Sequence, residues 1–324
     1  MIAVPLAILQ APAGPVVVFT DSSHGWAAGG GGIVRTSNGG RTWRVVSRVP
    51  VSQLDAVGRS TAFALAGDSL LRTRDGRRWR EISRPGLVAV DFADAKRGYG
   101  LDEHGRLLVS VDGGRRFRRA RAPSRLSALC VTRRGTWIAQ KNLVWRLSGS
   151  GFRLALRAGF EAGPIPVPEL GCKGSSVWSL FHHGGAAGSE GYTAFRSLDG
   201  GRTWRAVLAE LDSRQRRLPR IDAYAGPFTA LARGTAVFVG FCPACGLRQP
   251  TVSIVVTSDG GRTWKRASGL LDGHTPEAVT FIDSRRGWLL TTGQSRTSLL
   301  WRTSDGGRQG RLQLRSRLLT NLLP

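Results

Sequence analysis

The sequence lacks any apolar run long enough to cross a membrane as a helix, so no membrane-spanning helix is expected. Aromatic residues make up only 8% of the 324 residues, and 22 acidic residues face 47 basic ones. Lysine is nearly absent, since only Lys96, Lys141, Lys173 and Lys265 accompany the arginines. Hydrophobic residues still reach 41%, which is enough for the packed core of a folded protein.

The net charge of +25 has two explanations. A protein rich in Arg, Ala and Gly is typical of a GC-rich coding sequence, whatever the protein does. A strongly cationic surface nevertheless attracts anions, such as nucleic acid, anionic lipid, acidic polysaccharide or an acidic protein. Composition alone leaves both explanations open.

One short string recurs along the chain, which indicates a repeat architecture. In the fullest copies an Asn or Asp is followed by Gly-Gly-Arg-Thr-Trp, and these copies contain Asn38 with Trp43, Asp199 with Trp204 and Asp259 with Trp264. Weaker or truncated copies contain Asp75 with Trp79, Asp112 with Phe117, and Asp305. Asn38, Asp75 and Asp112 are evenly spaced, and the next equal step reaches Gly149, in a degraded seventh copy. We call these copies the box segments.

A second signature, Asp-x-x-x-Gly followed by Trp or Tyr, precedes the box segments and ends at Trp26, Tyr99 and Trp288. Looser versions end at Trp137 and Trp178. Short β-rich runs lie between the two signatures, so each unit contains four short strands, the content of one propeller blade. The sequence therefore predicts an all-β fold, a single seven-bladed β-propeller. Its expected blades are roughly 15–50, 51–85, 86–123, 124–160, 161–212, 213–270 and 271–324.

The residue types of the box segments are those of a tight turn. Asp and Asn accept hydrogen bonds from nearby backbone N–H groups, and Gly adopts backbone angles that other residues resist. The closing Trp starts the next strand and can wedge its ring between sheets. We therefore expect a structural role for the box segments.

These strings resemble the Asp-box, or BNR, repeat of sialidases, sortilin-type receptors, xyloglucanases and photosystem II assembly/stability factor-like proteins. The combination with the second signature is most similar to the last group, and it extends from about residue 15 to 307. The resemblance implies a seven-bladed propeller that binds a protein client, often outside the cytoplasm or in a thylakoid lumen. Nothing else in the sequence indicates photosynthesis. The leading expectation is a non-catalytic, monomeric scaffold without a cofactor or metal.

The alternative is a sialidase-like glycoside hydrolase or a glycan-binding propeller, with its site on the face opposite the box segments. A sialidase needs a Tyr nucleophile supported by Glu, and the sequence has only Tyr99, Tyr192 and Tyr224. Tyr99 occupies a position that other repeats fill with Trp, so we expect it to pack in the core. His182 and His183 begin a Gly-rich stretch, and we expect them to be solvated loop residues.

The four cysteines predict disulfides rather than a metal site. Cys242 and Cys245 form a CxxC motif in an expected hairpin loop, which favours a local disulfide. Zinc usually requires four ligands as two close pairs, and a second pair is absent. Cys130 and Cys172 precede Trp signatures on equivalent strands of neighbouring blades. A second disulfide forms there if the Cα atoms lie within about 7 Å.

The turns of each blade concentrate positive charge. In a four-stranded blade the first–second turn and the third–fourth turn emerge on the same side, so their basic residues are expected on one face. The candidate binding face contains Arg41, Lys96, Arg97, Arg133, Arg134, Arg202, Arg262, Arg285 and Arg286. Arg suits bidentate capture of carboxylate or phosphate. The alternative is that exposed turns simply collect Arg in an Arg-rich protein, and no motif indicates specific nucleic-acid binding.

The two ends of the sequence depart from the repeat. Residues 1–14 read as a signal-peptide remnant or as a first strand. Together with the cysteines, the signal-peptide interpretation predicts an extracytoplasmic protein, exported or periplasmic, with the cytoplasm as the alternative. Residues 309–324 lack the expected Thr-Trp, and they predict no particular way of closing the ring.

Overall fold

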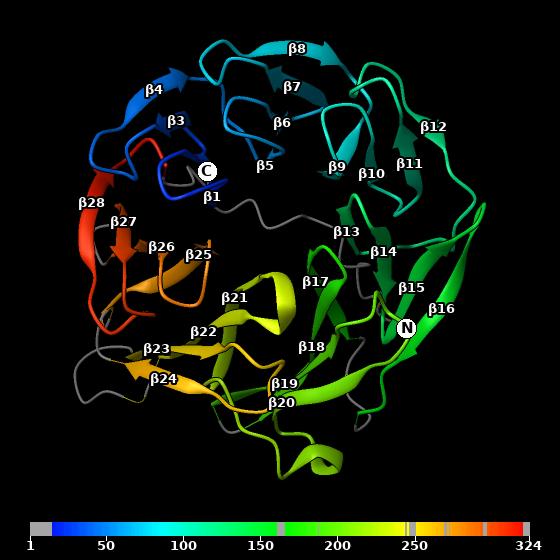
Figure 1. Ribbon diagram of the computed structural model, residues 1–324, viewed down its shortest axis with the longest axis vertical. Helices are drawn as coiled ribbons and strands as arrows, with labels where there is room; N and C mark the ends of the chain where they lie inside the picture. The colour runs from blue at the N-terminus through cyan, green and yellow to red at the C-terminus, as the bar shows by residue number, and fades with distance from the viewer. Residues whose placement is uncertain are drawn as a thin grey trace, which may run out of the picture.

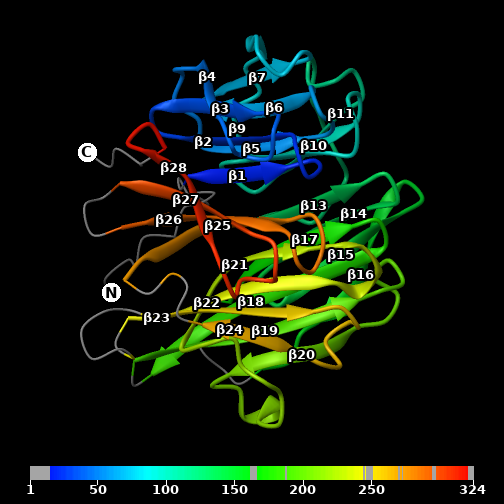
Figure 2. The same ribbon diagram turned by 60° about the vertical axis from the view of Figure 1, so that its left-hand side comes forward.

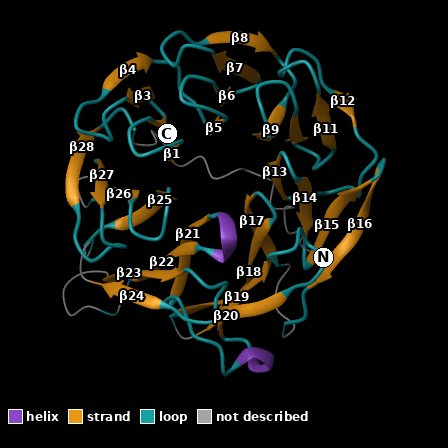
Figure 3. Ribbon diagram, in the orientation of Figure 1, coloured by secondary structure: helices purple, strands orange, loops and turns teal. Residues whose placement is uncertain are grey.

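The computed structural model describes residues 15–160, 166–186, 188–243, 245, 251–268, 271, 273–293 and 297–319. Seven four-stranded antiparallel sheets are arranged radially around a central axis (Figure 1). Strands dominate the ring, and the described helical content is two short 3-10 turns, Ser213–Gln215 and Ala232–Gly234 (Figure 3). The predicted all-β, seven-bladed propeller is confirmed. Among the described residues no helix is long and apolar enough to cross a membrane.

The strands of each blade follow one another in sequence order, and the first strand is the innermost. Blade 1 contains β1 (Val16–Phe19), β2 (Gly25–Gly29), β3 (Gly32–Thr36) and β4 (Arg44–Ser47). Blade 2 contains β5 (Gln53–Ala56), β6 (Ala62–Ala66), β7 (Ser69–Thr73) and β8 (Arg80–Ser83). Blade 3 contains β9 (Leu87–Phe92), β10 (Gly98–Asp102), β11 (Leu107–Ser110) and β12 (Arg118–Arg119).

The remaining blades repeat this order with longer strands. Blade 4 contains β13 (Ala128–Thr132), β14 (Gly135–Gln140), β15 (Leu143–Ser148) and β16 (Gly151–Arg157). Blade 5 contains β17 (Val167–Lys173), β18 (Ser176–Ala186), β19 (Ser189–Ser197) and β20 (Arg205–Glu210). Blade 6 contains β21 (Tyr224–Ala230), β22 (Ala236–Cys242), β23 (Thr251–Thr257) and β24 (Lys265–Ser268). Blade 7 contains β25 (Thr275–Phe281), β26 (Gly287–Thr292), β27 (Ser298–Thr303) and β28 (Arg311–Ser316).

The innermost strands run parallel to one another around the axis. The N–H groups of Val90 and Phe92 in β9 donate to Gln53 Oε1 and Asp55 Oδ2 in β5, each at 2.7 Å. The contacts advance two residues along β5 and two residues along β9, so the two strands run in the same direction. All first–second turns consequently emerge at one end of the disc, which we call the box face. The second–third turns emerge at the other end, the far face.

Aromatic side chains fill the spaces between blades. The largest fully buried side chains are the signature residues Trp26, Trp137, Trp178 and Trp288. Tyr99 is 8% exposed and packs with Leu101 and Ile138, as expected for a core residue. Burying each such ring removes about 150–250 Å² from water, so the wedges are a main source of cohesion between sheets.

A set of arginines joins neighbouring blades, and sequence patterns alone did not identify it. Each lies three residues before the Asp of a box segment, as Arg72 does before Asp75 and Arg196 before Asp199. Arg72 donates to the Gly113 carbonyl of the next blade at 3.3 Å, and Arg196 to that of Gly260 at 2.8 Å. The guanidinium of Arg72 also lies 5.0 Å from the ring centroid of Phe63, a cation–π contact. Part of the positive charge therefore holds blades together.

The ring closes where blade 7 meets blade 1 (Figures 1 and 2). The rings of Phe19 and Trp288 stack with centroids 3.5 Å apart, and Trp288 Nε1 donates to the Gly39 carbonyl at 3.3 Å. Beyond β28, the Leu318 carbonyl accepts a hydrogen bond from Gly31 N–H at 2.8 Å. Leu319 is fully buried in the same cluster as Trp288. The segment after the last strand thus packs against blade 1 and is hydrogen-bonded to it.

Replacing Leu319 with alanine should lower the free energy of unfolding by about 2–5 kcal/mol, since it leaves a cavity at the seam. Equilibrium urea unfolding measures the loss. Leu312→Ala is the matched control, because Leu312 is 38% exposed on β28 and a surface change costs about 0.5 kcal/mol. Equal losses in the two variants would contradict the role of Leu319 in stabilising the junction between blades 7 and 1.

Candidate functional site

The box segments form turns closed by an acidic or amide side chain. In blade 6, Asp259 Oδ1 accepts from the N–H groups of Arg262 and Thr263 at 3.0 Å, and from the Thr257 hydroxyl at 2.8 Å. Hydrogen bonds from the Thr263 hydroxyl and N–H lower the pKa of Asp259. The glycines between them, Gly260 and Gly261, have φ of 75° and 78°, in the left-handed region that favours Gly. The following Arg is left exposed at the turn.

The two turns of a blade lie side by side on the box face. The Gly39 N–H donates to the Ser23 carbonyl, and the Gly113 N–H donates to that of Lys96, each at 2.8 Å. The Gly306 N–H makes the same bond to Arg285 in blade 7. An aspartate also closes each of these first–second turns, as where Asp94 Oδ1 accepts from Lys96 and Arg97 N–H. Box segments and first–second turns therefore form one surface.

All nine residues of the predicted binding face are exposed: Arg41, Lys96, Arg97, Arg133, Arg134, Arg202, Arg262, Arg285 and Arg286. They lie in the first–second turns and in the box segments. Arg286 differs in pairing with Asp283, Nε to Oδ2 at 2.7 Å. In blade 4 the third–fourth connection at Gly149 is a two-residue hairpin between Ser148 and Gly151. The degraded seventh copy therefore adds no box turn.

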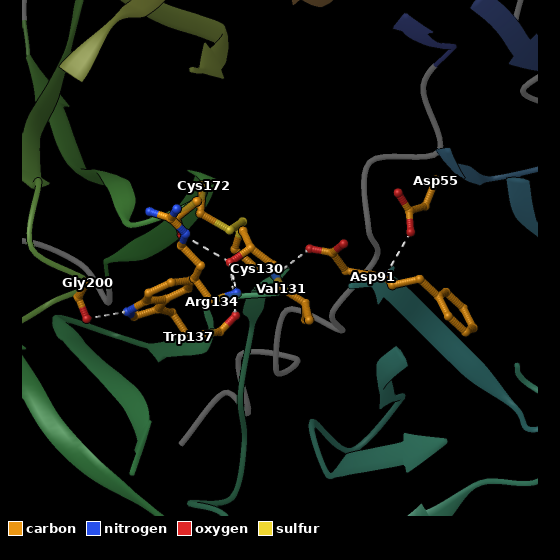
Figure 4. Close-up of a disulfide and its surroundings, with 12 residues drawn as sticks. Asp55, Asp91, Cys130, Val131, Arg134, Trp137, Cys172 and Gly200 are labelled. Carbon is orange, nitrogen blue, oxygen red and sulfur yellow. Dashed lines mark hydrogen bonds between the residues drawn. A yellow bond between two sulfur atoms is a disulfide. The ribbon is translucent and has the colours of Figure 1, made fainter. Parts of the chain in front are cut away.

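A disulfide joins the innermost strands of blades 4 and 5 beside this surface (Figure 4). The Cα atoms of Cys130 in β13 and Cys172 in β17 are 6.0 Å apart. Two residues along, the Thr132 hydroxyl donates to the Gly174 carbonyl at 3.0 Å. A second disulfide joins Cys242 and Cys245, with Cα atoms 5.4 Å apart. Two disulfides indicate an oxidising environment.

Carboxylates on the innermost strands accept hydrogen bonds from unpaired backbone N–H groups on the innermost strand of the next blade. Asp55 Oδ2 accepts from Phe92 N–H, and Asp91 Oδ2 accepts from Val131 N–H, each at 2.7 Å (Figure 4). These N–H groups face the axis, where no further described strand pairs with them. Burial raises the pKa of Asp55 to about 7. Burial and the nearby charge of Asp55 raise the pKa of Asp91 well above its usual range.

On the far face, His182 and His183 are structural, and the expectation of solvated loop residues is wrong. The Gly-rich stretch does not end the strand, because β18 continues to Ala186 through a register shift between His182 and Gly185. His183 is 5% exposed and hydrogen-bonds the Thr193 hydroxyl at 2.9 Å, which in turn donates to Asp212.

His182 lies between two glutamates. Its Nδ1 is 2.8 Å from Glu190 Oε1 and its Nε2 is 3.1 Å from Glu169 Oε1. Burial would lower the pKa of His182, but the hydrogen bonds to the two carboxylates raise it to about 10. The imidazolium is therefore the form present at neutral pH, and both ring nitrogens are occupied. Such a ring is a poor proton acceptor for catalysis.

Among known proteins, it is solved structures that resemble this protein. No protein-family model matches the sequence, and no curated protein matches it either. Solved structures match it over most of its length, and they support its assignment as a β-propeller.

Two of them are YCF48 structures. YCF48 bound to D1 peptide is 15% identical, with a TM-score of 0.56, and the match covers 91% of this chain and 95% of that one. YCF48 from Cyanidioschyzon merolae is 14% identical, with a TM-score of 0.57 and coverage of 93% and 95%. An ancestral GH74 enzyme is 12% identical, with a TM-score of 0.58, but the match covers 94% of this chain and 47% of the enzyme. At these identities the likeness establishes the fold alone.

Asp55→Asn should reduce the pH dependence of stability, while Asp91, whose pKa is also raised, should maintain part of it. Because the pKa of Asp55 is higher in the folded protein than in the unfolded state, the wild-type free energy of unfolding should fall as pH rises from about 4 to 7. Asparagine keeps an acceptor for Phe92 N–H but has no charge to bury. Urea unfolding across this range measures the slope, with Asp68→Asn at an exposed site as control. An unchanged slope in Asp55→Asn would contradict the assignment.

His182→Gln should likewise remove a loss of stability with rising pH, but in a higher pH range. A pKa raised by folding gives stability that is complete below the unfolded value of about 6.5 and is lost as pH rises through about 10. The stability difference between wild type and His182→Gln should therefore shrink across this range. Thermal melts at several pH values measure it, and His104→Gln, at an exposed position, is the control. A constant difference would mean that His182 acts by packing alone.

Proposed function

We propose that this protein is a non-catalytic propeller scaffold that binds a protein partner through its box face. The proposal is supported by two observations: the nine basic side chains are exposed, and backbone hydrogen bonds pair the turns of blades 1, 3 and 7. A neighbour of the same fold, YCF48, has been solved with a bound D1 peptide, so a propeller of this shape can hold a protein segment.

The chemistry of the box face favours an acidic segment. Its aspartates are engaged by their own turns, as Asp94 and Asp283 are by the backbone N–H groups that follow them. The carboxylates are thus already hydrogen-bonded within the turns, while the basic side chains other than Arg286, which pairs with Asp283, extend from exposed positions. Arg binds carboxylates through two parallel hydrogen bonds. Acidic side chains, or the terminal carboxylate of a peptide, match this surface.

The disulfides support an extracytoplasmic location for this scaffold. Small-molecule thiols keep cytosolic cysteines reduced, whereas secreted and periplasmic proteins retain their disulfides. The Cys130–Cys172 bridge joins two blades next to the Arg133–Arg134 turn. It therefore rigidifies the very part of the box face that carries this pair of arginines.

A glycan-active propeller is the second candidate, since GH74 enzymes share the fold and Glu169 and Glu190 lie together on the far face. Glycosidases use two carboxylates of distinct roles. Here both glutamates accept hydrogen bonds from a single imidazolium. This arrangement favours the scaffold. Release of sugars from a panel of sialosides and xyloglucan, lost in Glu169→Gln, would favour the enzyme instead.

Reversing three charges on the box face should weaken binding of an acidic peptide. The variant Arg97→Glu, Arg134→Glu, Arg285→Glu should lower affinity for a fluorescein-labelled oligoglutamate by about tenfold or more at low salt, measured by fluorescence anisotropy. The effect should diminish as salt rises.

A matched variant separates the face from the total charge. Arg44→Glu, Arg118→Glu, Arg315→Glu makes the same change in net charge at exposed positions on the outermost strands. It should retain most of the affinity. Equal losses in the two variants would show that overall charge, and not the box face, attracts the peptide.

A further inference from the structure

We infer that Asp222, Cys242 and Cys245 form a redox-controlled site for a zinc-type cation on the far face of blade 6. The two Sγ atoms and a carboxylate oxygen of Asp222 all lie within 4.8 Å of one another. Cys242 ends β22, and Asp222 lies just before β21, the strand that pairs with it. Adjacent strands thus bring a third ligand to the CxxC pair, a ligand that sequence spacing does not reveal.

The fold holds Asp222 firmly in this place. The Tyr192 hydroxyl donates to the Asp222 carbonyl at 2.8 Å and accepts from the N–H groups of Ile221 and Asp222 at 2.7 and 3.2 Å. Arg266 donates to the Ile221 carbonyl at 2.6 Å. A Cβ added at Gly240 would lie 2.5 Å from the Asp222 Cβ, so glycine allows the segment to approach β22 closely. The carboxylate is therefore positioned beside Cys242 by buried backbone contacts.

The ligand set fits a soft, tetrahedral cation. With Zn–S bonds of about 2.3 Å and Zn–O bonds of about 2.0–2.2 Å, the ligand atoms of tetrahedral zinc lie roughly 3.3–3.8 Å apart. The observed separations reach this geometry through small side-chain movements. Two thiolates disfavour Mg²⁺ and Ca²⁺, which prefer oxygen ligands. Three protein ligands leave one position for water or for a donor from a bound molecule.

The site exists only when the Cys242–Cys245 disulfide is reduced. A dithiol supplies two electrons and two protons and becomes a disulfide itself. The Cys242–Cys245 Sγ–Sγ bond breaks, and two thiols form. The cation then displaces the two thiol protons and binds the thiolates together with the Asp222 carboxylate.

Reduction should be selective for this disulfide. Cys245 is exposed, whereas Cys130 is 7% exposed between two blades. Exchange with a dithiol requires access to a sulfur atom. The Cys130–Cys172 bridge offers no exposed sulfur, because Cys130 is buried and Cys172 is half-buried between two packed blades. The Cys130–Cys172 disulfide therefore remains intact while the Cys242–Cys245 disulfide is reduced and the metal ligands become available.

Cobalt titration of the full-length protein tests the inference. After limited treatment with dithiothreitol and its removal, the wild type should bind one equivalent of Co²⁺ with thiolate-to-cobalt charge-transfer absorption, and Zn²⁺ should displace it. The oxidised protein should show no such band. Absence of the band in the reduced wild type would overturn the inference.

Variants identify the ligands. Cys245→Ser, at an exposed position, should abolish the band, while the double variant Cys130→Ser, Cys172→Ser should keep it. Asp222→Asn should weaken Co²⁺ binding by about tenfold or more, and Gly240→Ala should weaken it by displacing Asp222. Unaltered affinity in both Asp222→Asn and Gly240→Ala would remove Asp222 from the site. Unaltered peptide binding at the box face is expected in the Cys245, Asp222 and Gly240 variants, since the two sites lie on opposite faces.

Discussion

The structure depends on a constraint of small sheets: a four-stranded blade has two apolar faces and cannot cover either by itself. Each face is buried only by the next blade, through wedges such as Trp137 and Trp178. Hydrogen bonds from Trp137 and Arg146 to the Gly200 carbonyl then fix how neighbouring blades sit. Because every blade needs two neighbours, only a closed ring satisfies all of them, and this closure holds the turns in one surface.

The fold was largely predictable because its signals are local. A box turn is closed within a few residues, as Asp199 is by the N–H groups of Arg202 and Thr203. Even blade 4, whose box segment is degraded, folds as its neighbours do, because its strands and Trp137 are intact. The closure was not predictable, since the contact of Leu319 with blade 1 joins segments far apart in the sequence.

The candidate site was predictable only in part, for the same reason. Exposure of the turn arginines follows from turn geometry within one blade. The role of Arg72 or Arg196 does not, because their partners belong to the next blade. The two glycines after His182 and His183 predict a loop, whereas the strand continues through a register shift. Likewise, Asp222 joins the CxxC pair only through the pairing of β21 with β22.

The meeting of blades 7 and 1 differs from every other junction in the ring. Six junctions are crossed by the continuous polypeptide, and the one between blades 4 and 5 also carries a disulfide. Within the described part of the protein, the seventh is held by non-covalent contacts, among them the Phe19–Trp288 stack and the packing of Leu319. Thermal fluctuations that part the disc will therefore begin there, and amide hydrogens of β1 and β28 will exchange with solvent ahead of those beside the covalent bridge. The junction between blades 7 and 1 is therefore the point at which the ring opens first.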